Sequence, residues 1–167
     1  MNHVGTVVAQ WHTERPDLDA SPMEVIGRLS IVSRLVDAQL RQTFARHELD
    51  APSFDVLATL RRSGPPYQLT PTQLTRSAMV TSGAITQRLD RLEARGLISR
   101  GPRSDDGRGV QVTLTPTGYN TIDAALPDHL ATEQRLLAAL SEKQRRALAV
   151  TLQQLIDSVD SILTPEG

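Results

Sequence analysis

Apolar residues recur at helical spacing along most of the chain. From Pro22 to His47 they lie three or four residues apart, which predicts a long amphipathic helix. Ala51–Arg62 repeats the pattern and ends at a Ser-Gly-Pro-Pro run. From about Pro127 to Leu163 the pattern predicts two more amphipathic helices, divided near Ser141, which can cap the second one.

A shorter apolar segment lies at the N-terminus. It predicts an additional helix that Pro16 would end, with Trp11 on its last turns. Because aromatic side chains dominate local packing, we expect Trp11 to anchor this helix to the rest of the protein.

The central part of the chain changes to short helical segments. A helix capped by Thr70 is expected to run to about Ser77. A second helix begins at Thr81 or Ser82 and stops at Gly96, a residue type favoured just beyond helix ends. Two such helices joined by a turn predict a helix-turn-helix, whose second helix lies in a major groove of DNA.

The faces of that second helix follow from a rotation of about 100° per residue. Gln87 points nearly away from the predicted core, with Arg91 not far behind, so we assign both to DNA. Arg88 lies only about 70° from the buried stripe and is expected beside the core. The apolar positions that define this stripe are Ile85, Leu89 and Leu92.

Two strands follow, around a charged hairpin tip. Val110, Val112 and Leu114 alternate as in a half-buried strand, and the segment before them is rich in Gly, Pro and Asp. Arg103 and Arg108 on the tip would reach a phosphate or enter a narrow minor groove, which attracts arginine. The pattern is that of a winged helix-turn-helix.

Charge supports a single DNA-binding face. The chain has 167 residues, about one domain, and a formal net charge of −1. From Thr70 to Arg108, however, seven arginines stand against four acidic residues. A basic surface within a nearly neutral chain suits a protein that docks one face on DNA, although an ordinary solvated helix face has the same composition.

Other chemistry has little support in the sequence. No cysteine is present, which excludes disulfides and thiolate metal sites, and the four histidines lack metal-ligand spacing. Neither a nucleophile elbow nor a phosphate loop occurs. We therefore expect no enzyme activity, metal or cofactor. Without a long apolar run or a signal-peptide pattern, a soluble cytoplasmic protein is expected.

The segments LTPTQLTRSAMVTSGAITQRLDRLEARGLISR and RSDDGRGVQVTLTPTG closely resemble the MarR family of bacterial transcription regulators, and the likeness extends from about Pro22 to Leu163. Where the family wing usually carries Asp-Arg-Arg, Asp106-Gly107-Arg108 loses the middle arginine. This departure is expected to weaken the wing contact but to keep that of Arg108. The resemblance and the helix faces together give the expected DNA contacts: Thr72, Thr81, Ser82, Gln87, Arg91, Arg103 and Arg108.

A ligand site is also suggested. Asp55 and Arg62 lie seven residues apart, on one side of a predicted helix, and an ionised Asp55 among apolar neighbours is costly unless paired. Trp11, Asp55, Arg62 and Arg88 look like the ligand quartet of the urate-responsive branch of the MarR family, which also has an extra N-terminal helix. The resemblance implies that urate, or a phenolic or other small aromatic anion, binds between the dimerising region and the winged domain. Alternatively, Asp55 and Arg62 form a structural ion pair, Trp11 is a packing anchor and Arg88 contacts a phosphate.

The expected fold is mainly α with a small β wing. Residues 49–118 would form the winged helix-turn-helix domain; residues 1–48, with the extra helix in 1–21, and residues 127–167 would supply dimerisation helices. The terminal helices carry more apolar surface than a small winged domain covers, so we expect a homodimer. The dimer is expected to bind a pseudo-palindromic operator and to repress transcription. The alternatives are a monomeric bundle, a regulator without this ligand, and a dimeric module that binds protein instead of DNA.

Overall fold

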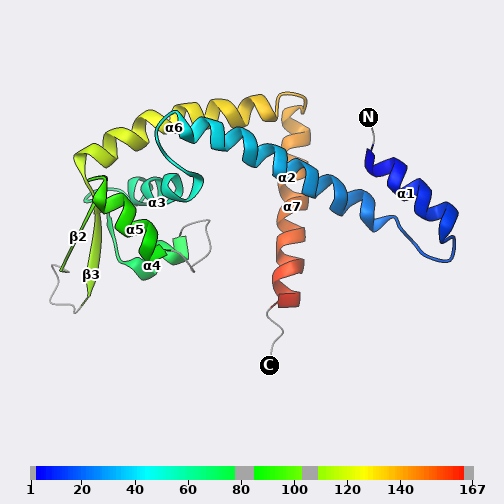
Figure 1. The fold of residues 1–167 in the computed structure, drawn as a ribbon, viewed down its shortest axis with the longest axis horizontal. Coiled ribbons are helices and arrows are strands. Elements are labelled where there is room, and N and C mark those ends of the chain that lie inside the picture. Colours follow the sequence, from blue (N-terminus) through cyan, green and yellow to red (C-terminus); the bar gives the residue numbers. More distant parts are fainter. Residues whose placement is uncertain (1–2, 78–84, 103–108, 164–167) are drawn as a thin grey trace. The chain divides into compact units, whose positions relative to one another are not determined.

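The computed structural model describes residues 3–77, 85–102 and 109–163. They form a mainly helical fold with one small antiparallel sheet, which confirms the predicted fold class (Figure 1). In chain order the elements are α1 (His3–Glu14), α2 (Pro22–Ala45), α3 (Ala51–Arg62), β1 (Gln68–Leu69), α4 (Pro71–Ser77), α5 (Ile85–Ala94), β2 (Ile98–Pro102), β3 (Val110–Leu114), α6 (Pro116–Leu136) and α7 (Glu142–Leu163).

The chain divides into two compact units, Met1–His129 and Leu130–Gly167. The division falls inside α6, which begins at Pro116 and not near Pro127, where we expected the first C-terminal helix to start. The helix starts earlier because its first turns belong to the core of the first unit, where Ile122 and Ala125 are fully buried. Pro127 lies within the helix.

Side-chain caps fix the starts of several helices. Asp50 accepts a hydrogen bond from the Ser53 amide at 2.8 Å, which satisfies one of the unpaired donors of α3. Thr70 and Gln73 exchange hydrogen bonds at the start of α4 in a capping box. Ser141 forms the same reciprocal pair with a glutamine three residues on, at the start of α7. The caps predicted at Thr70 and Ser141 are therefore confirmed.

The sheet has the order β1-β3-β2, and β2 pairs antiparallel with β3 from Ile98 opposite Leu114 to Pro102 opposite Val110. This hairpin, hereafter the wing, confirms the two predicted strands. Its tip lies outside the described residues. The third strand, β1, was not predicted, because two residues are too few to show an alternating pattern.

A single apolar core holds these elements together. Figure 1 shows α3, α4 and α5 gathered beside β2 and β3. Leu89 and Leu92 are almost fully buried and Ile85 packs on the core from its edge, as the predicted stripe requires. Each fully buried leucine contributes about 1.5–3 kcal/mol, so this stripe fixes which face of α5 points outward. The other large buried residues of the core include Phe44, Leu57, Leu60, Leu74, Val112 and Ile122.

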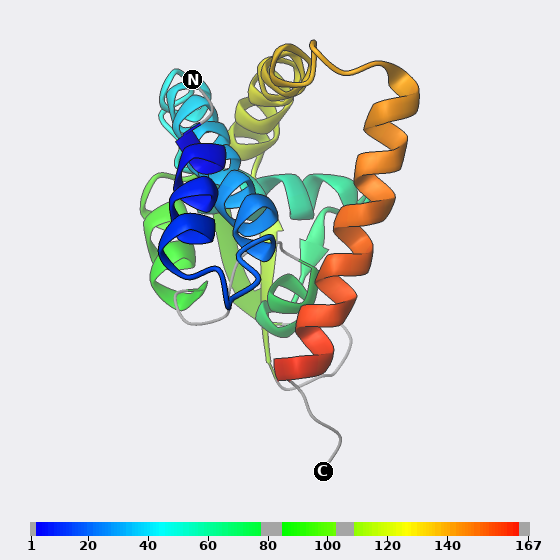
Figure 2. The same cartoon turned by 90° about the vertical axis from the view of Figure 1, so that its right-hand side faces the viewer.

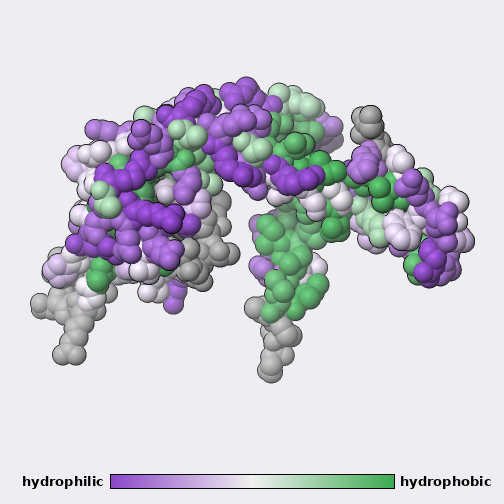
Figure 3. Space-filling view, viewed as in Figure 1, coloured by the Kyte–Doolittle hydropathy of each residue, from purple (hydrophilic) through white to green (hydrophobic). Residues whose placement is uncertain are grey.

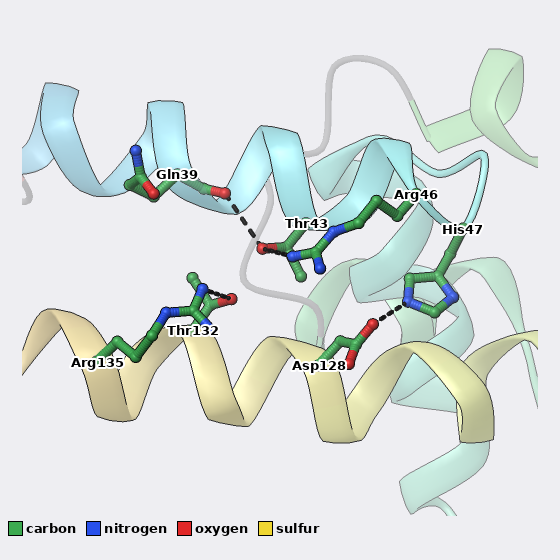
Figure 4. A network of polar contacts seen from close by, with 7 residues as sticks. All are labelled: Gln39, Thr43, Arg46, His47, Asp128, Thr132 and Arg135. Atoms are coloured by element: carbon green, nitrogen blue, oxygen red, sulfur yellow. Dashed lines mark hydrogen bonds and ion pairs between the residues drawn. The ribbon is translucent and has the colours of Figure 1, made fainter.

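The C-terminal end of α2 is joined to α6 beside this core. His47 Nε2 and Asp128 Oδ2 lie 2.9 Å apart, and Figure 4 shows the imidazole reaching across to the carboxylate. Next to them, the His129 ring stacks on Phe44 and lies tilted against Phe54, with ring centroids 5.4 and 4.7 Å apart. Aromatic packing and one polar bridge therefore hold this part of α6 against α2 and α3.

The N-terminal helix α1 lies along α2 (Figure 2). Val4 and Val8 are its buried residues, and Val4 Cγ1 lies 3.2 Å from where a Cβ on Gly27 would stand. Trp11, by contrast, keeps 45% of its surface exposed. The prediction that Trp11 anchors this helix is wrong, because two valines on the face toward α2 do so.

Much apolar surface stays uncovered in the single chain. On α2, Met23, Ile26, Val32 and Leu35 are between 46% and 61% exposed. No residue of α7 is buried, and Figure 3 shows apolar side chains along that helix. The excess of apolar surface expected for the terminal helices is thus present. None of the described helices combines the length and apolar character of a membrane span.

Candidate functional site

Helix α5, the predicted recognition helix of the helix-turn-helix, ends at a fixed point. Gly96 adopts a positive φ of 67°, and its amide donates to the Glu93 carbonyl at 2.8 Å. The Leu97 amide donates to the Leu92 carbonyl at 3.0 Å, which completes the closing turn. The stop predicted at Gly96 is therefore confirmed.

The face of α5 opposite its apolar stripe is open to solvent. Gln87 and Arg91 are exposed, as predicted, and so is Thr72 on the preceding helix α4. These three side chains are accessible to a duplex in the unbound protein. Of the other predicted DNA contacts, Thr81, Ser82, Arg103 and Arg108 lie outside the described residues.

Arg100 attaches the wing to the recognition helix. Its guanidinium lies 2.7 Å from Asp90 and 2.6 Å from Glu93, and its backbone amide donates to Glu93 at 2.9 Å. The hydrogen bond from Arg100 lowers the pKa of the Glu93 carboxyl below its usual value. β2 is thus held to α5 through charge-assisted hydrogen bonds. No role could be predicted for Arg100, because its position in the sequence does not show which acid it meets.

Arg88 is half-buried, consistent with its expected place beside the core. Its charge and that of Arg91 act on Asp50, the cap of α3. Burial raises the pKa of Asp50, but hydrogen bonds from Ser53 and these two cations outweigh burial and leave the pKa below its usual value.

Asp55 and Arg62 lie on the same side of α3, as their spacing predicted. Arg62 Nη1 is 3.9 Å from Asp55 Oδ1, at the outer limit of an ion pair. The Asp55 side chain is only 13% exposed, and its buried Oδ2 has no hydrogen-bond partner among the described residues. Arg62 Nη2 donates a short hydrogen bond to the carbonyl of Ser77, the last residue of α4. In the described part of the chain, an acceptor without a donor therefore lies beside a cation that also donates to the end of α4.

Trp11 and Arg88 are not joined to this pair by any hydrogen bond or ion pair among the described residues. Trp11 lines a hollow of about 480 Å³ on α1, together with Gln10, Thr13 and Glu14. The structure thus brings together two of the four predicted ligand residues. Within the described ranges, no three His, Asp or Glu side chains gather as a metal site requires.

Known proteins resemble this chain over most of its length. The sequence pattern of the MarR family matches residues 47–109. The HTH-type transcriptional regulator PecS of Dickeya dadantii (strain 3937) is 42% identical over 149 residues, which cover 89% of this chain and 90% of PecS.

Two solved structures extend the likeness. A mutant MarR from Escherichia coli complexed with operator DNA is 26% identical, with a TM-score of 0.69, over 87% of this chain and 96% of that one. BpsR of Bordetella bronchiseptica, described with a mechanism for regulation of its DNA binding by 6-hydroxynicotinic acid, is 26% identical, with a TM-score of 0.71, over 80% of this chain and 93% of that one.

Proposed function

Because this chain belongs to the MarR family of HTH-type transcriptional regulators, we propose that it represses transcription as a homodimer, released from its operator by a small aromatic anion such as urate. The orientation of α5 carries the DNA-binding part of the proposal. Gln87 and Arg91 are exposed while Leu89 and Leu92 are buried, so the helix offers a polar face to a major groove.

Each exposed side chain has a matching partner on DNA. A glutamine pairs with adenine through two hydrogen bonds, and an arginine pairs in the same way with guanine or contacts phosphate. Thr72, on the first turn of α4, suits a phosphate contact. The remaining contacts are assigned by family resemblance alone: Thr81 and Ser82 at the start of the recognition helix, and Arg103 and Arg108 in the wing tip.

A homodimer accounts for the uncovered apolar surface. Residues such as Ile26 and Leu35 on α2, and most of α7, would be buried against a second copy. Two recognition helices related by a two-fold axis then meet half-sites about one helical turn of DNA apart, so the operator would be a pseudo-palindrome.

The effector part rests on Asp55 and Arg62. Urate is a planar anion with N–H donors. Its N–H groups suit Asp55 Oδ2, which has no hydrogen-bond partner among the described residues, and its negative charge suits the guanidinium of Arg62. Engaging Arg62 would compete with its hydrogen bond to the Ser77 carbonyl. That bond holds the end of α4, immediately before the segment that leads into α5. Losing it would disturb the spacing of the two recognition helices and release the DNA.

One solved relative supports an effector of this class. DNA binding by BpsR is described as regulated by 6-hydroxynicotinic acid, an aromatic acid. Trp11 and Arg88 are assigned to the same ligand by resemblance to the urate-responsive branch, with the indole covering the planar ligand.

The proposal is tested by a mobility shift with the DNA upstream of the protein's own gene, with and without urate or salicylate. We expect a retarded protein–DNA complex that dissociates when urate is added. The fluorescence of Trp11, the single tryptophan, reports urate binding. Arg62→Ala should bind the operator yet lose the urate response. Arg28→Ala, which removes an exposed arginine paired with Glu24, is the control and should respond like wild type. An Arg62→Ala protein that urate releases as readily as wild type would contradict the pocket.

Two further measurements address DNA binding itself. Affinity should fall steeply between about 50 and 200 mM salt, because each phosphate contact releases counterions. Gln87→Ala combined with Arg108→Ala should abolish operator binding and leave the dimer intact. Salt-independent affinity, or unchanged binding by this double variant, would instead favour a module that binds protein.

A further inference from the structure

The last two residues of α3 face different neighbours. Arg62 turns toward Asp55 and the end of α4, as described above. Arg61, about 100° further round the helix, reaches α6 instead. Its Nε donates to Asp123 Oδ1 at 2.8 Å and its Nη2 donates to Asp123 Oδ2 at 3.3 Å. The same short segment of α3 is therefore attached to the end of α4 on one side and to α6 on the other.

Two aromatic rings complete the surroundings of Arg61. Its Cζ lies 4.3 Å from the centre of the Tyr119 ring on α6 and 5.4 Å from that of Tyr67. The two tyrosines meet edge to face, with centroids 5.4 Å apart. The hydrogen bond to Asp123 raises the pKa of Arg61 above its usual value, so the guanidinium stays charged. A planar guanidinium can form a forked carboxylate pair and lie on an aromatic face at once, whereas a lysine cannot.

Tyr67 extends this cluster to the wing. Its carbonyl accepts a hydrogen bond from the Leu114 amide at 3.1 Å. The two residues that follow it, Gln68 and Leu69, form β1 and pair with β3. Arg61, Tyr67, Tyr119 and Asp123, hereafter the α3–α6 junction, thus lie where α3, the base of the wing and α6 meet.

We propose that Arg61 is a positioning residue, through which movement of α3 is passed to α6 and to the wing. A short helix moves as a rigid rod, so a displacement at Arg62 must also move Arg61 and its attachments. Tyr119 and Asp123 lie on the part of α6 that precedes its passage into the C-terminal unit. The junction therefore connects α3 and the base of the wing with the helix that leads out of the first unit. The effector side of this coupling rests on the function proposed above; the DNA side does not.

The first experiment measures amide hydrogen exchange of residues 117–129 in the full-length protein, free and bound to operator. In wild type, operator binding should slow exchange across this part of α6. Arg61→Lys keeps the charge but loses the fork, and should lose most of that response while still binding DNA. Asp123→Asn removes the charge of the partner and should behave in the same way. Arg15→Lys is the matched control and should respond like wild type, because Arg15 forms a forked pair with Asp17 but contacts no ring among the described residues.

The second experiment measures operator affinity with and without saturating urate. In these variants, the factor by which urate weakens operator binding should be at least about fivefold smaller than in wild type, while urate still quenches the fluorescence of Trp11. If Arg61→Lys and Asp123→Asn only lower the melting temperature and keep both responses, Arg61 merely stabilises the fold and the proposal is overturned. A wild-type α6 that does not respond to operator overturns it as well. If operator changes α6 but neither urate nor salicylate acts, the effector assignment fails, and the exchange data still decide the role of Arg61.

Discussion

Replacing Gly118 with alanine should destabilise the protein far more than the same change at Gly27, Gly64, Gly96 or Gly101. Gly118 stands in the first turn of α6, at the end of the LTPTG motif. A Cβ added there would lie 1.9 Å from the Leu97 carbonyl oxygen and 2.9 Å from Leu114 Cδ1. Contacts of real Cβ atoms essentially never fall below 3.0 Å. The Leu114 side chain can shift, but the Leu97 carbonyl belongs to the backbone, so the main chain itself would have to move. The glycine is needed for close approach and not for its φ angle.

The size of the stability loss follows from the hydrogen bonds that the added methyl group would disrupt. Leu97 lies directly beyond the end of the recognition helix, and its carbonyl accepts a hydrogen bond from the Thr115 amide at 3.2 Å. Thr115 Oγ1 also donates to the Gly96 carbonyl at 2.7 Å. Overpacking costs about 1–3 kcal/mol, and each of the two hydrogen bonds contributes about 1 kcal/mol. We therefore expect a loss of about 3–5 kcal/mol, or roughly 6–20 °C in melting temperature for a chain of this size.

Denaturant and thermal unfolding at one fixed protomer concentration measure this loss, since dimer stability depends on concentration. Gly101→Ala is the control: nothing lies within 4 Å of its added Cβ, so stability should change by no more than about 0.5 kcal/mol. Gly96→Ala, at a φ of 67°, should cost about 1–2 kcal/mol through backbone strain alone. A Gly118→Ala protein as stable as the Gly101→Ala protein would refute the close approach of α6 to the end of α5.

Three other substitutions separate the contributions of single polar groups. Asp50→Ala removes the cap of α3, which accepts from the Ser53 amide, and should cost about 1 kcal/mol of stability at pH 7. Because folding lowers the pKa of Asp50, its stabilisation is complete above the ordinary pKa near 4 and is lost below it. The difference in stability from wild type, measured by urea unfolding, should therefore shrink at pH 3. Arg100→Ala frees the wing from Glu93 and should weaken operator binding roughly threefold to tenfold in a mobility shift without dissociating the dimer; unchanged affinity would show that the wing needs no such attachment. Asp55→Asn should stabilise the unliganded protein by about 1 kcal/mol in thermal unfolding and weaken its urate response, and a loss of stability would identify the carboxylate as a structural ion-pair partner.

Features that depend on neighbours in the sequence were predictable. The bounds of α3 match Ala51–Arg62, and the caps at Thr70 and Ser141 act as expected, because a cap joins residues only three positions apart. The buried stripe of α5 also follows from spacing alone. In each case, the helical repeat or the turn chemistry fixes the outcome before any distant part of the chain is placed.

Features that depend on distant partners were not predictable. Spacing shows which side of a helix turns inward, but not which residue it meets there. Arg61 and Asp123 lie 62 positions apart, and Arg100 meets Glu93 only because the wing folds back on α5. The prediction that Trp11 anchors α1 was wrong for a related reason. It ranked side chains by size and overlooked that Val4 and Val8 lie on the face of α1 that α2 covers.

Asp55 separates a functional interpretation of this site from a structural one. A carboxylate that is 13% exposed has lost most of its hydration, and a cation 3.9 Å from one oxygen, itself half exposed, restores little of it. Its second oxygen has no donor within the described residues, whereas Asp50, the cap of the same helix, accepts a hydrogen bond from the Ser53 amide. A group retained for stability alone would be expected to be satisfied as Asp50 is, since an unsatisfied buried acceptor costs about 1–3 kcal/mol. In the mechanism we propose, a ligand would supply the missing donor and offset the cost at Asp55, and Arg62 would carry the effect to Ser77 at the end of α4.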